Sequence, residues 1–327
     1  MRILFMGTPE FAVPSLRALV EEGHDLVAVA TRPDRPRRSS ASRPGPSPVK
    51  VEAGRLGLPL QQPDSVRSAA FLDVVRAAAP ETIVVVAFGK ILPPGLIDLP
   101  PRWCINLHAS LLPAYRGAAP IARAIIAGET RTGLTTMRMD RGLDTGDILM
   151  RRECNIGREE TAGELTARLA VLGAGLLIET LQAHSSAALR PSPQDHARAS
   201  LAPPLDREDG SLDWSDTARA LTNRIRGCNP WPLAAAGLRG QRIQILRARE
   251  AIEEGLPTGP GAAGPGTVLP PGQVALASGE RLVVACGGGT LLSVLEMRFP
   301  GRRAVMARDA LNGRLVGAGD RFTPPPV

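Results

Sequence analysis

The chain has 327 residues, of which 43% are hydrophobic and 22% are charged, and its formal net charge is +7. This length allows two domains with at least one large core, and the composition excludes a disordered or fibrous protein. No apolar run reaches the ~18 residues that a membrane-spanning helix needs, so we expect no contact with a membrane.

The first half of the chain alternates between strand and helix patterns. Residues 3–6, 26–30 and 83–88 are typical of buried strands, and residues 14–22 of a helix that Gly23 ends. This alternation predicts an α/β fold of the Rossmann-like type. The turn at residues 7–10 lacks a G-x-G-x-x-G pattern, so we expect no nicotinamide cofactor. The amino-terminal segment is typical of a strand rather than a secretion signal, which favours a cytoplasmic protein.

Three polar side chains near predicted strand ends form the candidate site. Asn106 and His108 would face the same side of a strand, because side chains alternate along it. A second apolar run, residues 134–139, leads into a glycine-rich loop that carries Asp144. An amide, an imidazole and a carboxylate can together polarise a carbonyl and move protons around it. The alternatives, which we expect at surfaces or in turns, are His24, His184, His196, Asp140 and Asp147.

A linker separates two predicted domains. Thr161 and Glu164 fit a capping box, and the helix that follows carries a core stripe of Leu165, Leu169, Leu172 and Leu176. Beyond it the chain becomes rich in Ser, Ala and Pro. We therefore predict a catalytic domain at 1–189, a linker at 190–208 and a second domain at 209–327.

The second domain has the pattern of a small β-barrel. Ser215 can cap a helix that buries Ala218, Leu221 and Ile225. Short strand-like runs follow at residues 242–246, 273–277, 281–285 and 291–295, and residues 255–266 form a Gly/Pro-rich loop. The four cysteines, which include no C-x-x-C pair, predict neither a zinc site nor a disulfide framework, and we expect no metal.

Residues 106–120 and 143–147 closely resemble the formyltransferase family that uses 10-formyltetrahydrofolate. The Asn, the His, the Ser-Leu-Leu-Pro turn and the Asp-Thr-Gly loop appear in the family's order. Residues 213–215, 225–232 and 311–313 resemble the carboxyl-terminal domain of the members that act on methionyl initiator tRNA. The resemblance implies a Rossmann-like N-terminal formyltransferase domain followed by a C-terminal OB-like β-barrel domain that binds tRNA.

The resemblance also implies a reaction and its residues. A formyl group would pass from N10 of 10-formyltetrahydrofolate to a primary amine, with Asn106 donating to the oxyanion. His108 would donate to the same oxygen or protonate N10, and Asp144 would fix the imidazole tautomer or relay a proton. The folate would lie against Ser110, Leu111, Leu112 and Pro113, with Phe88, Gly89 and Ile91 lining the pterin pocket. Arg116 is a further candidate, since it could bond carbonyls of the same turn.

A basic loop marks the macromolecular substrate. Residues 32–50 hold six basic side chains and one acid. In the resembled tRNA enzymes this loop reaches the acceptor stem, which implies tRNA contacts from Arg37, Arg38, Arg43 and Lys50. The family's glycines and paired lysines are replaced here, so the essential arginine stays open. Such a composition would also give a merely disordered loop.

We therefore predict an enzyme that formylates methionyl initiator tRNA for translation initiation and acts as a monomer. A formyltransferase that acts on an amino sugar nucleotide is the alternative, because some such enzymes share this two-domain body. A non-catalytic RNA-binding or folate-binding protein is the third possibility, although intact Asn106, His108 and Asp144 speak against it.

Overall fold

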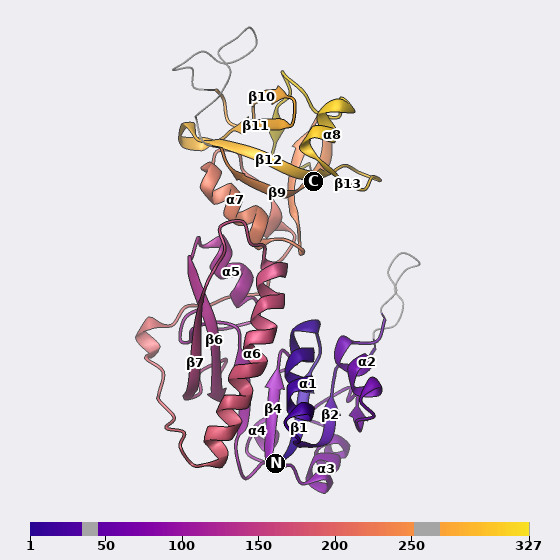
Figure 1. The fold of residues 1–327 in the computed structure, drawn as a ribbon, viewed down its shortest axis with the longest axis vertical. Coiled ribbons are helices and arrows are strands. Elements are labelled where there is room, and N and C mark those ends of the chain that lie inside the picture. Colours follow the sequence, from indigo (N-terminus) through magenta and orange to yellow (C-terminus); the bar gives the residue numbers. More distant parts are fainter. Residues whose placement is uncertain (35–44, 252–268, 327) are drawn as a thin grey trace. The chain divides into compact units, whose positions relative to one another are not determined.

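The computed structural model describes residues 1–34, 45–251 and 269–326, which divide into two compact units (Figure 1). The first unit comprises Met1–Pro120, Arg131–Asn155 and Leu165–Pro203. The second comprises Ile121–Thr130, Ile156–Glu164 and Pro204–Val327. Much of the segment predicted as a linker thus groups with the first unit. The domain bounds 1–189 and 209–327 stay a prediction.

The first unit is built on a seven-stranded sheet with the order β3-β2-β1-β4-β5-β6-β7. These strands are Leu60–Gln61, Asp25–Ala30, Arg2–Gly7, Thr82–Val86, Cys104–His108, Arg131–Arg138 and Ile148–Asn155, in that order. The strands from β3 to β5 pair in parallel, whereas β6 and β7 pair antiparallel with their neighbours. The parallel strands place their carboxyl ends at one edge of the sheet. The predicted α/β, Rossmann-like fold is confirmed.

Helices accompany this sheet along the chain. They are α1 (Val13–Glu21), α2 (Pro48–Arg55), α3 (Ala69–Ala78), α4 (Pro94–Ile97), α5 (Pro120–Ile126) and α6 (Ala162–Ser185), of which α5 and α6 are shared between the units. The capping box of α6 is present. The Thr161 backbone N–H donates to the Glu164 carboxylate at 2.8 Å, and the Glu164 N–H donates to the Thr161 hydroxyl at 3.3 Å.

One predicted strand boundary and one predicted helix stripe in the first unit can be compared with the structure. Strand β4 ends at Val86 rather than at residue 88, because Ala87 has φ 47° and turns the chain out of the sheet. The core stripe of α6 is largely confirmed, since Leu165, Leu169 and Leu176 are buried. Leu172 is only half-buried.

The second unit is a curled antiparallel sheet with the order β10-β11-β12-β9-β8-β14, and β13 pairs with β12. Its strands, from β8 to β14, are Ala234–Leu238, Gln241–Glu250, Val274–Ser278, Arg281–Ala285, Leu291–Arg298, Ala304–Met306 and Phe322–Thr323. Two helices, α7 (Ala218–Gly227) and α8 (Ala307–Asn312), belong to the same unit. The curled half-barrel confirms the predicted OB-like domain.

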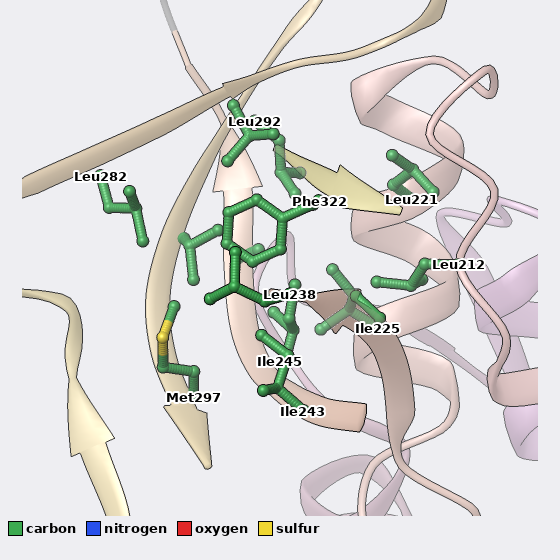
Figure 2. Packing of buried hydrophobic residues seen from close by; sticks show 14 of the residues in the cluster. Leu212, Leu221, Ile225, Leu238, Ile243, Ile245, Leu282, Leu292, Met297 and Phe322 are labelled. Atoms are coloured by element: carbon green, nitrogen blue, oxygen red, sulfur yellow. The ribbon is translucent and has the colours of Figure 1, made fainter. Parts of the chain in front are cut away.

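The core of the second unit lies between α7 and the strands. Figure 2 shows Leu221 and Ile225 of α7 turned toward the strands, where Ile243, Ile245 and Phe322 lie.

Helix α7 starts later than predicted, because its capping residue is Thr217 and not Ser215. The Thr217 hydroxyl accepts the Ala220 N–H, whereas the Ser215 hydroxyl donates to Asp213.

Three further kinds of feature bear on function in the described residues, namely reactive cysteines, metal sites and membrane-spanning helices. None of the four cysteines forms a disulfide, and burial raises the pKa of the Cys228 and Cys286 thiols to about 12, so these two stay protonated. No group of three His, Cys, Asp or Glu side chains in the described part could hold a metal ion. None of the helices described there combines the length and apolar character needed to cross a membrane.

Candidate active site

Strand β5 carries Asn106 and His108 to the edge of the first sheet. The strand is buried throughout and pairs with β4 on one side and β6 on the other. Because side chains alternate along a strand, Asn106 and His108 share one face, as predicted. Their exposed fractions are 9% and 6%, so each is nearly removed from solvent.

The His108 ring is fixed at one nitrogen and faces a carboxylate with the other. Its Nε2 lies 2.9 Å from the Tyr115 carbonyl oxygen, and because a carbonyl only accepts, Nε2 is the donor. Its Nδ1 then faces the Asp144 Oδ2 atom at 3.6 Å. This separation is slightly too long for a direct hydrogen bond, and such catalytic contacts often shorten only when substrate binds.

Asp144 depends on two glycines, Gly146 in its own loop and Gly117 in the turn after β5. Its Oδ2 accepts the Gly117 backbone N–H at 2.8 Å, and its own φ is 53°, a left-handed conformation that aspartate tolerates better than most residues. A Cβ at Gly146 would lie 1.8 Å from the Arg138 carbonyl oxygen, and one at Gly117 would lie 2.7 Å from that of Ala202. Both approaches therefore require glycine.

The Asn106 amide is available to a ligand. Within residues 1–34, 45–251 and 269–326, its side chain forms no hydrogen bond, although the residue is only 9% exposed. Buried polar groups are normally paired, because an unsatisfied amide costs free energy. An unpaired amide on the same face as His108 therefore indicates a donor reserved for a bound molecule.

Comparisons with known proteins identify the family. Residues 1–181 match the formyl transferase model, and residues 204–315 match the model described as formyl transferase, C-terminal domain. The chain belongs to the formyl transferase family. Over 323 residues it is 48% identical to the methionyl-tRNA formyltransferase of Heliobacterium modesticaldum, which covers 98% of this chain and 100% of that one. The methionyl-tRNA formyltransferase of Solibacter usitatus is 46% identical over 322 residues, with 98% of each chain covered.

Solved structures show the same fold at low identity. This formyltransferase is similar to WlaRD, a sugar 3N-formyl transferase, with a TM-score of 0.64, 16% identity, and coverage of 93% of this chain and 99% of that one. HypX from Aquifex aeolicus in complex with tetrahydrofolic acid gives a TM-score of 0.62 at 17% identity. That match covers 97% of this chain and 48% of HypX. At these identities the likeness is evidence for the fold alone.

The turn predicted to bind folate is held by internal hydrogen bonds. The Ser110 hydroxyl donates to the Ala114 carbonyl at 2.6 Å. The Thr135 hydroxyl donates to the Ser110 carbonyl at 2.7 Å and accepts the Leu112 N–H at 3.1 Å. Ser110 and Leu112 are buried, whereas Leu111 and Pro113 are half-buried. The backbone of this turn is thus fixed by hydrogen bonds to the Ser110 and Thr135 hydroxyls.

The three predicted pterin-pocket residues differ in their surroundings. Phe88 is 2% exposed and packs in the core with Leu92 and Leu96, while its carbonyl accepts the Thr8 hydroxyl at 3.0 Å. Gly89 is exposed with φ 79°, and Ile91 is 75% exposed. Only Gly89 and Ile91 therefore present an open surface, and the folate roles of all three stay a prediction.

The residues predicted to bind tRNA are only partly described. Arg37, Arg38 and Arg43 lie outside the described residues. Lys50, on α2, forms an ion pair with Asp34, and this hydrogen bond holds the pKa of the Asp34 carboxyl below its usual range. The pairing partly neutralises the charge of Lys50 and anchors one end of the basic loop.

The alternative residues have other surroundings than expected. His24 and His184 are half-buried rather than exposed, and only His196 lies at the surface. Among the described residues, the aspartate that accepts hydrogen bonds within the loop is Asp140, from the Gly142 N–H and the Thr145 hydroxyl, rather than Asp147.

Sequence reasoning missed one buried polar residue of this formyltransferase. Gln194 donates to the backbone carbonyl oxygens of Asp144 and Gly146, yet it falls in the segment predicted as a linker. The only signal is that Gln194 follows a Pro-Ser-Pro segment, residues 191–193, in which the two prolines stiffen the backbone.

Proposed function

We propose that this formyltransferase moves the formyl group of 10-formyltetrahydrofolate to the amino group of methionyl initiator tRNA, for translation initiation. The identity of the acceptor substrate is supported by 44–48% sequence identity to methionyl-tRNA formyltransferases along 96–98% of this chain. The chemistry is supported by the unpaired Asn106 amide beside the facing pair of His108 and Asp144. We further propose that the protein acts as a monomer in the cytoplasm.

Asn106 stabilises the charge that develops during transfer. When bound, the folate supplies a formyl carbon that an amine can attack and a nitrogen that can leave. As the amine adds, negative charge builds on the formyl oxygen, and the Asn106 amide donates to that oxygen. Loss of one such donor typically lowers turnover ~10²–10³-fold.

His108 and Asp144 move the proton. The amine must lose a proton, and the departing N10 must gain one. Because Nε2 of His108 is held by the Tyr115 carbonyl, Nδ1 is the ring atom left for exchange, and it faces Asp144. The pair takes the proton from the amine and returns it at N10, a role typically worth ~10²–10⁴ in rate.

Binding of the two substrates is assigned to separate segments. The turn Ser110, Leu111, Leu112 and Pro113 offers a rigid edge for a flat pterin, with Phe88, Gly89 and Ile91 across from it in this proposal. Arg37, Arg38 and Arg43 would contact tRNA phosphates, and Lys50 would support them from the base of the loop.

An acceptor assay tests the proposal. The protein is mixed with 10-formyltetrahydrofolate and, in parallel, charged initiator methionyl-tRNA, uncharged tRNA or an amino sugar nucleotide. We expect formylation of the charged tRNA only. Formylation of the sugar alone would replace the proposal with the alternative, for which the likeness to sugar formyltransferases at 16–21% identity is a likeness of fold. Absence of all three products would remove the enzymatic proposal.

A further inference from the structure

Residues 192–202, which we call the strap, connect three parts of the first unit. Ser192 exchanges two backbone hydrogen bonds with Ile148 at the start of β7, at 2.8 and 2.9 Å. At the other end, the Arg116 N–H donates to the Ser200 carbonyl at 2.8 Å, and the Ala202 N–H donates to the Arg116 carbonyl at 2.7 Å. The strap therefore spans from the end of the aspartate loop to the turn after β5.

Gln194 is the buried centre of the strap. It is 5% exposed, and its Nε2 donates to the carbonyl oxygens of Asp144 at 2.8 Å and Gly146 at 2.7 Å. Its Oε1 accepts from Arg116 at 3.2 Å from Nε and 2.7 Å from the terminal nitrogen. Both amide protons and both lone pairs are thus used. The orientation is unambiguous, because carbonyls only accept and a guanidinium only donates.

Arg116 is a buried cation whose side chain is held by an amide and an imidazole. Its exposed fraction is 7%, and besides Gln194 its terminal nitrogen contacts His196 Nδ1 at 3.0 Å. In the part of the chain that the structure describes, Arg116 forms no ion pair with a carboxylate. Burying a charge in this way is costly for folding, which indicates that the arrangement serves the site rather than stability.

The residues around Arg116 hold both members of the proton-transfer pair. The preceding residue, Tyr115, accepts from His108 Nε2, and the following residue, Gly117, donates to Asp144 Oδ2. Through Gln194, the Arg116 side chain also holds the backbone of the Asp144 loop. One short turn therefore sets the position of the imidazole and of the carboxylate.

We propose that Arg116 and Gln194 are positioning residues for formyl transfer, which keep Asp144 Oδ2 against His108 Nδ1. This inference rests on the proposed function for the chemistry but not on the identity of the acceptor. Without the hydrogen bonds from Arg116 to Gln194 and from Gln194 to the loop carbonyls, the aspartate loop moves away from His108. A displacement of ~1 Å typically costs ~10²-fold in rate. The folate turn at 110–113 is held by the Ser110 and Thr135 hydroxyls. Its contact with the strap, from the Ser200 N–H to the Pro113 carbonyl at 3.4 Å, does not involve the side chains of Arg116 or Gln194, so we expect the turn to be unaffected.

Two substitutions of Gln194 separate positioning from folding. Gln194→Glu keeps an acceptor for Arg116 but loses both donors to the loop carbonyls, whereas Gln194→Ala loses all four contacts. We expect both to lower kcat by ~10–100-fold while KM for 10-formyltetrahydrofolate stays within about twofold. The matched control is Thr82→Val, which removes a fully buried hydroxyl that donates to the Arg102 carbonyl at 2.9 Å. Thr82 lies at the amino end of β4, whereas His108 lies at the carboxyl end of the parallel neighbour β5. It should lower the melting temperature and leave kcat unchanged.

A double-mutant cycle with Asp144→Asn decides whether Gln194 acts through the carboxylate. If it does, the Gln194→Ala, Asp144→Asn double variant has a kcat within about threefold of Asp144→Asn alone. Losses that multiply, or an unchanged kcat in both Gln194 variants, would overturn the inference. Should Gln194→Ala fail to fold, Gln194→Glu enters the cycle in its place. All measurements use whichever acceptor the wild type formylates. If that acceptor is not methionyl-tRNA, the proposed function is wrong, but the test of Gln194 can still be carried out.

Discussion

Asn106 has a side chain that forms no hydrogen bond within the described residues, and replacing its amide with a carboxylate tests its role. Asn106→Asp keeps the shape but replaces an N–H donor with an anionic oxygen that repels the developing oxyanion. We expect kcat to fall by at least ~10²–10³-fold, with a circular dichroism spectrum like that of the wild type. A variant that turned over within about fivefold of the wild-type rate would remove Asn106 from the mechanism.

His184 makes stability depend on pH. Its ring stacks on Trp103 with centroids 4.3 Å apart, and burial lowers the pKa of His184 below its usual 6.5. The neutral form is therefore favoured in the folded state, so the stabilisation is complete above about pH 6.5 and is lost as pH falls through the lower, folded-state pKa. We expect the melting temperature of the wild type to drop between about pH 7.5 and 5.5, and that of His184→Phe to drop less. An equal drop in both proteins would contradict this account.

At the scale of elements, a buried carboxylate joins α1 to α2. Glu52 accepts from Arg17 at 2.7 and 2.9 Å and from Arg55 at 2.6 and 3.1 Å. These hydrogen bonds, Arg17 first, hold the pKa of Glu52 at about 2, so its stabilisation is complete above the usual 4.5 and is lost as pH falls through about 2. We expect Glu52→Gln to lower the melting temperature by ~2–4 °C at neutral pH, and by less near about pH 3.

The control for Glu52 is an ion pair of the same chemistry at the surface. Asp73, on α3, pairs with Arg76 at 2.7 Å, but both side chains are well exposed. Exposed pairs contribute little to stability, so Asp73→Asn should shift the melting temperature by less than ~1 °C. A larger shift from Asp73 than from Glu52 would show that burial is not what matters here.

The elements that could be predicted from sequence are those with strong local signals. Apolar runs identified β1, β2 and β4, and the capping box at Thr161 identified α6. Strand β8 was missed because Ala234, Ala235 and Ala236 lack the branched or aromatic side chains that mark strands. The role of Gln194 could not be predicted either, because its partner Arg116 lies 78 positions away in the chain. Only tertiary structure brings such residues together.

At the scale of the whole molecule, the basic loop is predicted to bind the tRNA. Replacing Arg37, Arg38 and Arg43 with alanine should raise KM for tRNA while kcat at saturation and KM for folate change little. Because each phosphate contact contributes ~0.7–0.9 to the dependence of log affinity on log salt, the slope should flatten by ~2–3. Arg76→Ala, on α3, removes an exposed arginine elsewhere and should leave the slope unchanged. If the affinity of the triple variant depended on salt as steeply as that of the wild type, the loop would not be a tRNA contact.

The strap has a consequence for protein engineering. Fragments and chimaeras of two-domain enzymes are commonly joined where the sequence looks least structured, which here would be near residue 189. A fragment ending there would keep every strand of the first sheet but lack Gln194 and the backbone of Ser200 and Ala202. A junction after Pro203 retains them. The shortest useful catalytic fragment, or a hybrid that borrows its second unit from a relative, should therefore be cut about fourteen residues later than the composition suggests.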